Sequence, residues 1–145
     1  MFICLSREIS VQAEGVILCV DDEETILDSL DMQSQALFHQ RFIIELALGA
    51  GDAWDILESY DCDQLPVLII ITDWQMPVVK GDEFLVEAHR RFPTVVKIML
   101  SGQANPQAVR NAEQNGGLFR FIGKPWKAEE LHQAIQDGLA EGGVP

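Results

Sequence analysis

Five short apolar runs recur along the chain, and each is rich in β-branched or aliphatic side chains. Runs of this length and composition, bounded by polar residues, glycine or proline, predict buried β-strands. The expected strands are 16–20, 42–48, 67–72, 95–100 and 118–123. Gly49-Ala50-Gly51 closes the second run, and a polar loop from Tyr60 to Pro66 leads into the third.

Segments with apolar residues at helical spacing lie between these runs and after the last one. The expected helices are 25–39, a short one capped by Asp52, one opened by Gly81-Asp82, one from Asn105-Pro106 to 115–117, and one over about 128–140. Strands that alternate with helices predict an α/β fold with a doubly wound, five-stranded parallel sheet and right-handed crossovers.

The domain organisation follows from the same pattern. Residues 15–141 are expected to form one domain, with a loose extension over 1–14 and a tail or linker start over 142–145. The opening residues lack the pattern of a signal peptide, and no run approaches the length of a membrane span. Three scattered cysteines without a C-x-x-C spacing favour a reducing compartment, so a cytoplasmic location is expected.

The formal net charge of −13 limits the kinds of partner that the protein is expected to bind. Nucleic acids and anionic membranes attract Lys and Arg, so neither is expected to bind directly. Basic protein surfaces and divalent cations are favoured instead. An acidic composition is also common among cytosolic proteins, and that simpler interpretation has equal weight.

Acidic residues follow two of the predicted strands. Asp21-Asp22 comes after the first, and Asp73 ends the strongly apolar third. Ligands of open α/β sheets bind outside the carboxyl ends of the strands, where these side chains would meet. Three clustered carboxylates repel one another unless a cation binds, and oxygen ligands select Mg²⁺ or Ca²⁺. Helix capping explains Asp21-Asp22 equally well when that pair is taken alone, but it does not explain Asp73.

Two further polar residues end the fourth and fifth strands. The ammonium of Lys124 can pair with Asp73 when the site is empty and with a phosphoryl oxygen when it is filled. The hydroxyl of Ser101 can donate to the same group, although an ordinary turn residue is the commoner interpretation. Because Asp can attack a phosphoryl donor, this set indicates phosphoryl transfer to Asp73.

The motifs, taken together, resemble the receiver domain of two-component response regulators. They are Val20-Asp21-Asp22-Glu23, Asp73-x-x-Met76-Pro77, Ser101-Gly102 and Lys124-Pro125, and the resemblance covers about residues 15–141. It implies a flavodoxin-like fold with strand order 2-1-3-4-5. It also implies a signalling domain rather than an enzyme.

The resemblance assigns roles at the site. Asp73 would accept the phosphoryl group from a sensor histidine kinase or a phosphotransfer protein. Asp22, Asp73 and the backbone carbonyl of Gln75 would bind Mg²⁺, with Asp21 acting mostly through water. Ser101 and Lys124 would hold the phosphoryl oxygens.

Further implied roles concern the response. Phe121 would be the switch aromatic that turns inward with Ser101, and its alternative is a simple core position. The surface from Asn105 to Ala140 would then control an output domain or partner protein, with homodimerisation left open. Gln75 and Gln103 occupy positions that tend to set the phosphate lifetime. Trp126 resembles receivers fused to output modules such as HD-GYP phosphodiesterases, although we favour packing over partner anchoring for it.

Other classes of protein fit less well. A magnesium-dependent phosphatase of the haloacid dehalogenase type needs an Asp two residues after its nucleophile, where this chain has Gln75. A flavodoxin needs a phosphate loop rich in Ser, Thr and Gly, but the acidic loop 21–24 would repel a phosphate. A degenerate receiver that acts only as a binding module remains a third alternative.

Overall fold

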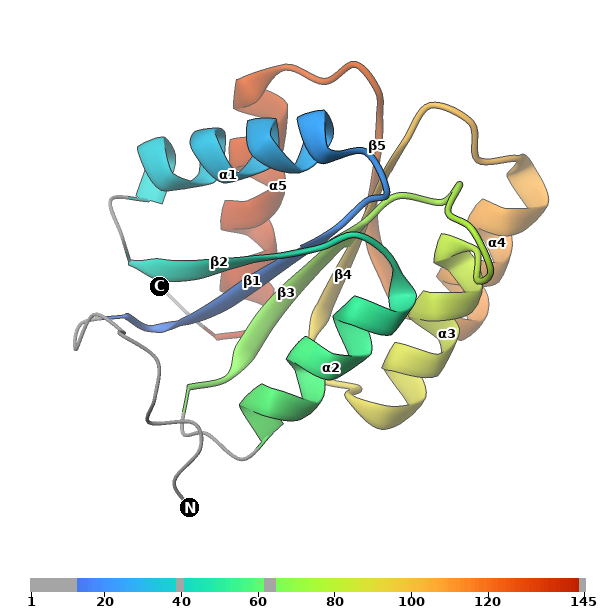
Figure 1. Ribbon diagram of the computed structural model, residues 1–145, viewed down its shortest axis with the longest axis horizontal. Helices are drawn as coiled ribbons and strands as arrows, with labels where there is room; N and C mark the ends of the chain where they lie inside the picture. Colours follow the sequence, from blue (N-terminus) through green and yellow to red (C-terminus); the bar gives the residue numbers. More distant parts are fainter. Residues whose placement is uncertain (1–12, 39–40, 62–64, 144–145) are drawn as a thin grey trace.

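A computed structural model describes residues 13–38, 41–61 and 65–143 of the chain. Five parallel strands form one sheet in the order β2-β1-β3-β4-β5, which confirms the predicted fold and topology (Figure 1). The strands are β1 (Gly15–Val20), β2 (Phe42–Ala47), β3 (Val67–Thr72), β4 (Val96–Ser101) and β5 (Leu118–Gly123). The helices are α1 (Glu24–Phe38), α2 (Ala50–Asp61), α3 (Gly81–Arg91), α4 (Pro106–Asn115) and α5 (Ala128–Glu141).

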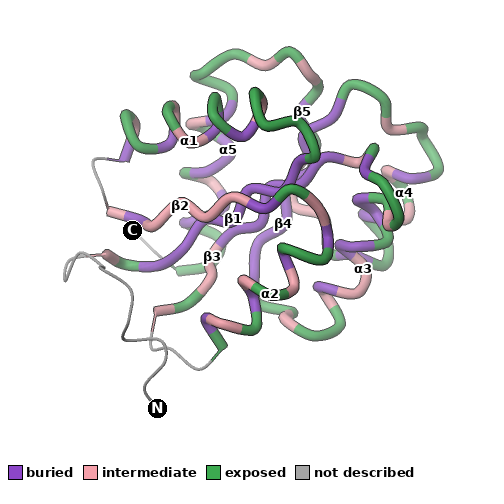
Figure 2. The backbone as a smooth tube through the Cα atoms, viewed as in Figure 1, coloured by how far each residue is buried: buried purple, intermediate pink, exposed green. Residues whose placement is uncertain are grey.

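The helices cover both faces of the sheet and divide the core in two. Helices α1 and α5 pack on one face, while α2, α3 and α4 pack on the other (Figure 1). Every residue of β1 is buried, as expected for a strand that is central in the sheet and covered on both sides (Figure 2). Cys19 in this strand is a buried free thiol, and burial raises its pKa to about 12. It therefore behaves as a small apolar residue.

The strand register brings the carboxyl ends of the strands to one edge. Val20 at the end of β1 lies beside Thr72 of β3 and Ala47 of β2. Beyond these pairs, the Asp73 N–H donates to the Val20 carbonyl at 2.9 Å. The Asp21 N–H donates to the Ala47 carbonyl at 3.0 Å. The acids that follow β1 and β3 are thus fixed next to each other by backbone hydrogen bonds.

The sequence-based bounds were wrong for the second helix. It begins at Ala50, so Asp52 lies in its first turn rather than at its cap, and the Asp52 carboxylate accepts from the Leu48 N–H at 3.4 Å. It also extends through Tyr60 and Asp61, which were assigned to the loop. The reason is a buried stripe of Ala53, Leu57 and Tyr60, whose hydroxyl donates to Glu45 of β2 at 2.6 Å.

The start of the fourth helix agrees with its sequence signal. Asn105 is its N-cap, and its side chain accepts from the Ala108 N–H at 2.8 Å. The expected extension over 1–14 lies outside the described residues except for its last two. His39, Cys4, Cys62 and the end of the expected tail are also outside them. Among the described residues, no helix is long and apolar enough to cross a membrane.

Val78 in the loop after β3 has a left-handed backbone conformation, with a φ of 72°, and its side chain is fully exposed. A β-branched residue in this region is strained, at a cost of about 1–3 kcal/mol. Replacing Val78 with Asn, which tolerates this conformation, should therefore stabilise the fold by about 1 kcal/mol. Urea unfolding measures the change. Val78→Ala removes the β-branch but lacks the polar side chain by which Asn tolerates this conformation, so it should gain less. A loss of stability in Val78→Asn would contradict the assigned strain.

Lys97 of β4 is an unexpected feature of the core, because a lysine is 1% exposed there. Its ammonium lies 3.0 Å from Nδ1 of His89 and donates to the carbonyls of Phe92 and Pro93 at 3.1 and 3.5 Å. Among the described residues no carboxylate forms an ion pair with it. Burial lowers the pKa of Lys97 to about 8. The ring nitrogen of His89 and the carbonyls after α3 thus take the place of a carboxylate as partners of the Lys97 ammonium.

This burial predicts a pH-dependent stability. The pKa of Lys97 is lower in the folded protein than in the unfolded chain, so the folded state binds fewer protons between about pH 8 and 10.5. Stability should therefore rise with pH through this window, with roughly 1 kcal/mol of the gain between pH 7 and 9. Urea unfolding of wild type and Lys97→Met at both pH values isolates the effect, since other groups titrate in both proteins. Equal pH dependence in the two would contradict it.

Candidate functional site

Three carboxylates meet at the edge of the sheet where β1 and β3 end. Asp21 and Asp73 are buried, at 1% and 6% exposed, while Asp22 is exposed. Each residue of this acidic group offers an oxygen, and these atoms all lie within 4.8 Å of one another. The sequence placed the three together, and the structure brings them to one site.

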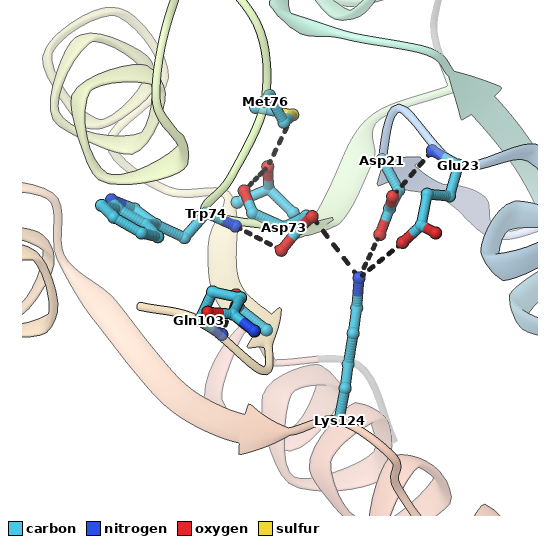
Figure 3. A network of polar contacts seen from close by, with 9 residues as sticks. Asp21, Glu23, Asp73, Trp74, Met76, Gln103 and Lys124 are labelled. Atoms are coloured by element: carbon cyan, nitrogen blue, oxygen red, sulfur yellow. Dashed lines mark hydrogen bonds and ion pairs between the residues drawn. The ribbon is translucent and has the colours of Figure 1, made fainter. Parts of the chain in front are cut away.

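Lys124 extends from the end of β5 into the acidic group (Figure 3). Its ammonium lies 2.7 Å from Asp21, 3.4 Å from Asp73 and 4.0 Å from Glu23. The expected pairing with Asp73 is present, but the shortest contact is with Asp21, which the sequence did not indicate. The reason is that Asp21 is fixed by the β1–β2 ladder and by accepting the Glu23 N–H at 2.9 Å.

The pKa values show the balance of charge in this pair. Burial raises the pKa of Asp21, and the hydrogen bonds from Lys124 and from the Glu23 N–H only partly oppose it. Burial lowers the pKa of Lys124, but the hydrogen bond to Asp21 and the charge of Asp73 outweigh it, so the pKa lies above its usual value. Lys124 thus remains an ammonium that counters part of the negative charge.

The loop after β3 holds the Asp73 side chain in place. The Trp74 N–H donates to Oδ1 of Asp73 at 2.7 Å (Figure 3). The Gly81 N–H donates to the Trp74 carbonyl at 2.8 Å. A Cβ at Gly81 would lie 2.0 Å from the Asp73 carbonyl oxygen. Glycine is therefore required there for the start of α3 to pack directly on the backbone of Asp73 and Trp74.

A cavity of about 690 Å³ opens above the acidic group. Ser101, Gln75, Gln103 and Lys124 line it together with Asp22 and Asp73, so all the residues predicted for the site except Asp21 and Phe121 border this cavity. Ser101 is buried, and its hydroxyl oxygen accepts the Gln103 N–H at 3.2 Å. Ser101 thus forms a turn and also borders the cavity, and its role in holding a phosphoryl oxygen stays a prediction.

The two aromatic residues near the end of β5 differ in their setting. Phe121 is 39% exposed, so the alternative of a simple core position is wrong. Trp126 packs against the core, and its indole N–H donates to Gln33 of α1 at 2.8 Å. Packing, which the sequence favoured for Trp126, is confirmed.

The donor set fits a hard divalent cation. All three groups of the acidic cluster are carboxylates, which suit Mg²⁺ or Ca²⁺ and do not suit zinc. Buried Asp21 and Asp73 share one ammonium between them, which leaves negative charge for a cation to neutralise. The exposed Asp22 lies at the cavity, where an ion would enter.

The sequence did not reveal a second set of polar contacts beside the site. Asp82, 9% exposed, accepts the Trp74 indole N–H at 2.9 Å and the side-chain amide of Asn111 at 2.9 Å. An acid near the start of a helix is usually explained by its favourable interaction with the helix dipole. The sequence therefore carries no signal that Asp82 binds both Trp74 and Asn111.

Comparison with known proteins identifies the class. The family model of the response regulator receiver domain matches residues 17–136. The chain therefore belongs to the receiver domains of two-component response regulators. This agrees with the fold and with the residues that meet at the edge of the sheet.

Relatives with curated names support the same class. The chemotaxis protein CheY homolog of Campylobacter jejuni is 28% identical over 87% of this chain and 93% of that protein. The hydrogenase transcriptional regulatory protein HoxA of Cupriavidus necator is 27% identical over 90% of this chain, which spans only 25% of HoxA. The chain thus corresponds to about a quarter of one relative and to nearly all of the other.

Solved structures give the same picture. The receiver domain of an HD domain-containing protein from Pseudomonas fluorescens Pf-5 has a TM-score of 0.78 and 26% identity, covering 90% of this chain and 98% of that one. A CheY-like receiver domain from Methanospirillum hungatei JF-1 has a TM-score of 0.77 and 28% identity, with the same coverage. The phosphatase and flavodoxin alternatives are not favoured by these comparisons.

Proposed function

We propose that Asp73 accepts a phosphoryl group from a histidine kinase or phosphotransfer protein. A carboxylate oxygen of Asp73 attacks the phosphorus, the P–N bond of a phosphohistidine breaks, and the imidazole leaves with the bonding electrons. The observation that carries the proposal is the convergence of Asp21, Asp22, Asp73 and Lys124 at one edge of the sheet. Phosphoryl transfer needs mainly such positioning and compensation of charge.

Other residues support the transfer. Mg²⁺, when held by Asp22, Asp73, the Gln75 carbonyl and more distantly Asp21, would neutralise charge on the phosphoryl oxygens. The Lys124 ammonium, 3.4 Å from Asp73, is placed to interact with the new phosphoryl group. Ser101 lines the same cavity, and its O–H can donate to a phosphoryl oxygen while its oxygen accepts from Gln103.

The consequence of phosphorylation is a signal rather than turnover of a substrate. Phe121 is exposed on β5, so it is free to turn inward as Ser101 shifts, and this would change the surface of α4, β5 and α5. That surface would then act on an output domain or partner protein, or on a second copy of the chain. The relationship to an HD domain-containing protein supports an output of this kind. The cytoplasmic location and the domain bounds 15–141 stay predictions.

Intact mass after incubation with acetyl phosphate tests this function. We expect a gain of one phosphoryl group in the presence of Mg²⁺ and none when EDTA removes the metal. No gain despite measurable Mg²⁺ binding would contradict self-catalysed transfer and indicate a need for the cognate kinase. No gain and no Mg²⁺ binding would overturn the proposal in favour of a degenerate receiver that acts through protein contacts.

A further inference from the structure

Helix α4 is connected to the loop after β3, which begins with Asp73 and Trp74, by a chain of side-chain hydrogen bonds. Asp82 lies in the first turn of α3, and its two carboxylate oxygens have different partners. Oδ1 accepts from the indole of Trp74, the residue after Asp73, and Oδ2 accepts from Asn111 of α4. One buried side chain thus joins three segments: the loop after β3, α3 and α4.

The two ends of this connection differ in how firmly they are held. At the loop end, the Trp74 backbone N–H binds Asp73 at 2.7 Å, and Gly81 packs against the Asp73 backbone. Lys80 also lies 5.3 Å from the centre of the Trp74 ring. At the other end, Asn111 is a single side chain on the second turn of α4, and its side-chain oxygen accepts from the Asn115 amide at 2.8 Å. A displacement of α4 must therefore break the Asp82–Asn111 bond or move Asp82 and the indole with it.

Burial makes this contact consequential. Asp82 is only 9% exposed, and no Lys or Arg forms an ion pair with it among the described residues. Loss of one of its two hydrogen-bond donors would leave a buried carboxylate oxygen unsatisfied, which costs free energy. The arrangement of α4 in which Asn111 reaches Asp82 is therefore favoured over positions that break this hydrogen bond.

We propose that Asp82 is a positioning residue that couples the placement of α4 to the environment of Trp74, and through the Trp74 N–H to Asp73. This route is separate from the pair Ser101 and Phe121. Its effect on signalling rests on the proposed function, whereas the coupling itself exists in the unphosphorylated protein. The chemistry at Asp73 and the position of α4 then change together.

Fluorine NMR on the full chain labelled with 5-fluorotryptophan tests the coupling. The resonance of Trp74 is assigned by its loss in Trp74→Phe. We expect Asn111→Ala to shift the Trp74 resonance, because both side chains donate to the one carboxylate of Asp82. Gln114→Ala, which removes an exposed amide from the same helix, should leave it unchanged. An unshifted Trp74 resonance in folded Asn111→Ala would overturn the coupling.

Variants of Asp82 separate positioning from simple stability. Asp82→Asn keeps an oxygen for the indole and gains an amide that can donate to Asn111 Oδ1, so it should retain a Trp74 resonance close to that of wild type. Asp82→Ala should shift it in the same direction as Asn111→Ala and further. Equal spectra for the Asn and Ala variants would contradict the role of the hydrogen bonds.

The signalling arm uses amide hydrogen exchange of residues 106–115 before and after treatment with acetyl phosphate and Mg²⁺. Wild type should show a phosphorylation-dependent change in this helix, and Asn111→Ala should lose most of it while gaining the same phosphoryl mass. The same change in both would overturn the signalling role. A wild type that neither gains phosphoryl mass nor binds Mg²⁺ contradicts the proposed function instead, and the Trp74 resonance then decides the coupling alone.

Discussion

Replacing Asp73 with Asn is expected to abolish phosphoryl incorporation while leaving the fold intact. The amide nitrogen and oxygen of Asn fit the same space, and the Trp74 N–H can still donate to the side-chain oxygen. An amide is a far weaker nucleophile than a carboxylate, so the step at this position stops. Intact mass after incubation with acetyl phosphate and Mg²⁺ should show no phosphoryl gain, compared with one gain in wild type.

The controls for this prediction use one acid of the same cluster and one acid outside it. Asp22→Asn retains the acceptor and should still be phosphorylated, but only at a higher Mg²⁺ concentration, because one oxygen ligand is weakened. Asp137→Asn changes a surface acid that pairs with Arg120, and it should behave as wild type. Phosphoryl incorporation at another residue of Asp73→Asn would refute the assignment of Asp73 as acceptor.

Removing a charge from the cluster should not destabilise the Asp73→Asn protein. Asp21 and Asp73 both carry negative charge close to one ammonium, and the mutual repulsion of like charges falls when one becomes neutral. Thermal unfolding should therefore give a Tm at or above that of wild type. This outcome distinguishes loss of chemistry from loss of folded protein.

The parts of the site that the sequence revealed are those fixed by local signals. Apolar runs predicted the strands, and parallel strands must place Asp21, Asp73 and Lys124 at a common edge. The start of α4 at Asn105-Pro106 was predictable for the same reason, and the cap that the structure shows there joins residues only three positions apart. Features of this kind need no knowledge of distant contacts.

The parts that the sequence did not reveal depend on distant partners. Lys97 interrupts an apolar run, and its burial requires carbonyls at the end of α3 and a ring nitrogen from His89. Tyr60 extends α2 because its hydroxyl reaches Glu45 on β2. The shortest partner of Lys124 is Asp21, 103 positions away, where the motif pointed to Asp73. Polar residues of this sort look like surface residues until the fold supplies their partners.

Replacing Lys124 with Met should separate Mg²⁺ binding from the response to phosphorylation. The variant keeps an unbranched side chain but leaves buried Asp21 without its ammonium, which costs about 1.5–3 kcal/mol in the metal-free protein. Mg²⁺ no longer competes with that ammonium, so it should bind more tightly, by roughly tenfold for each 1.4 kcal/mol regained. Thermal unfolding with and without Mg²⁺ measures both effects.

The phosphorylated Lys124→Met protein should lack the change in α4, β5 and α5 that wild type shows. The ammonium lies within 3.4 Å of Asp73, and without it no side-chain cation from β5 is placed to follow the added charge. Hydrogen exchange of residues 105–140 in protein of equal phosphoryl content measures the response. Lys127→Met removes an exposed lysine three positions later and should respond as wild type. A full response in Lys124→Met would show that the signal leaves the site by another route, and the Asp82 connection to α4 would then be the route to test.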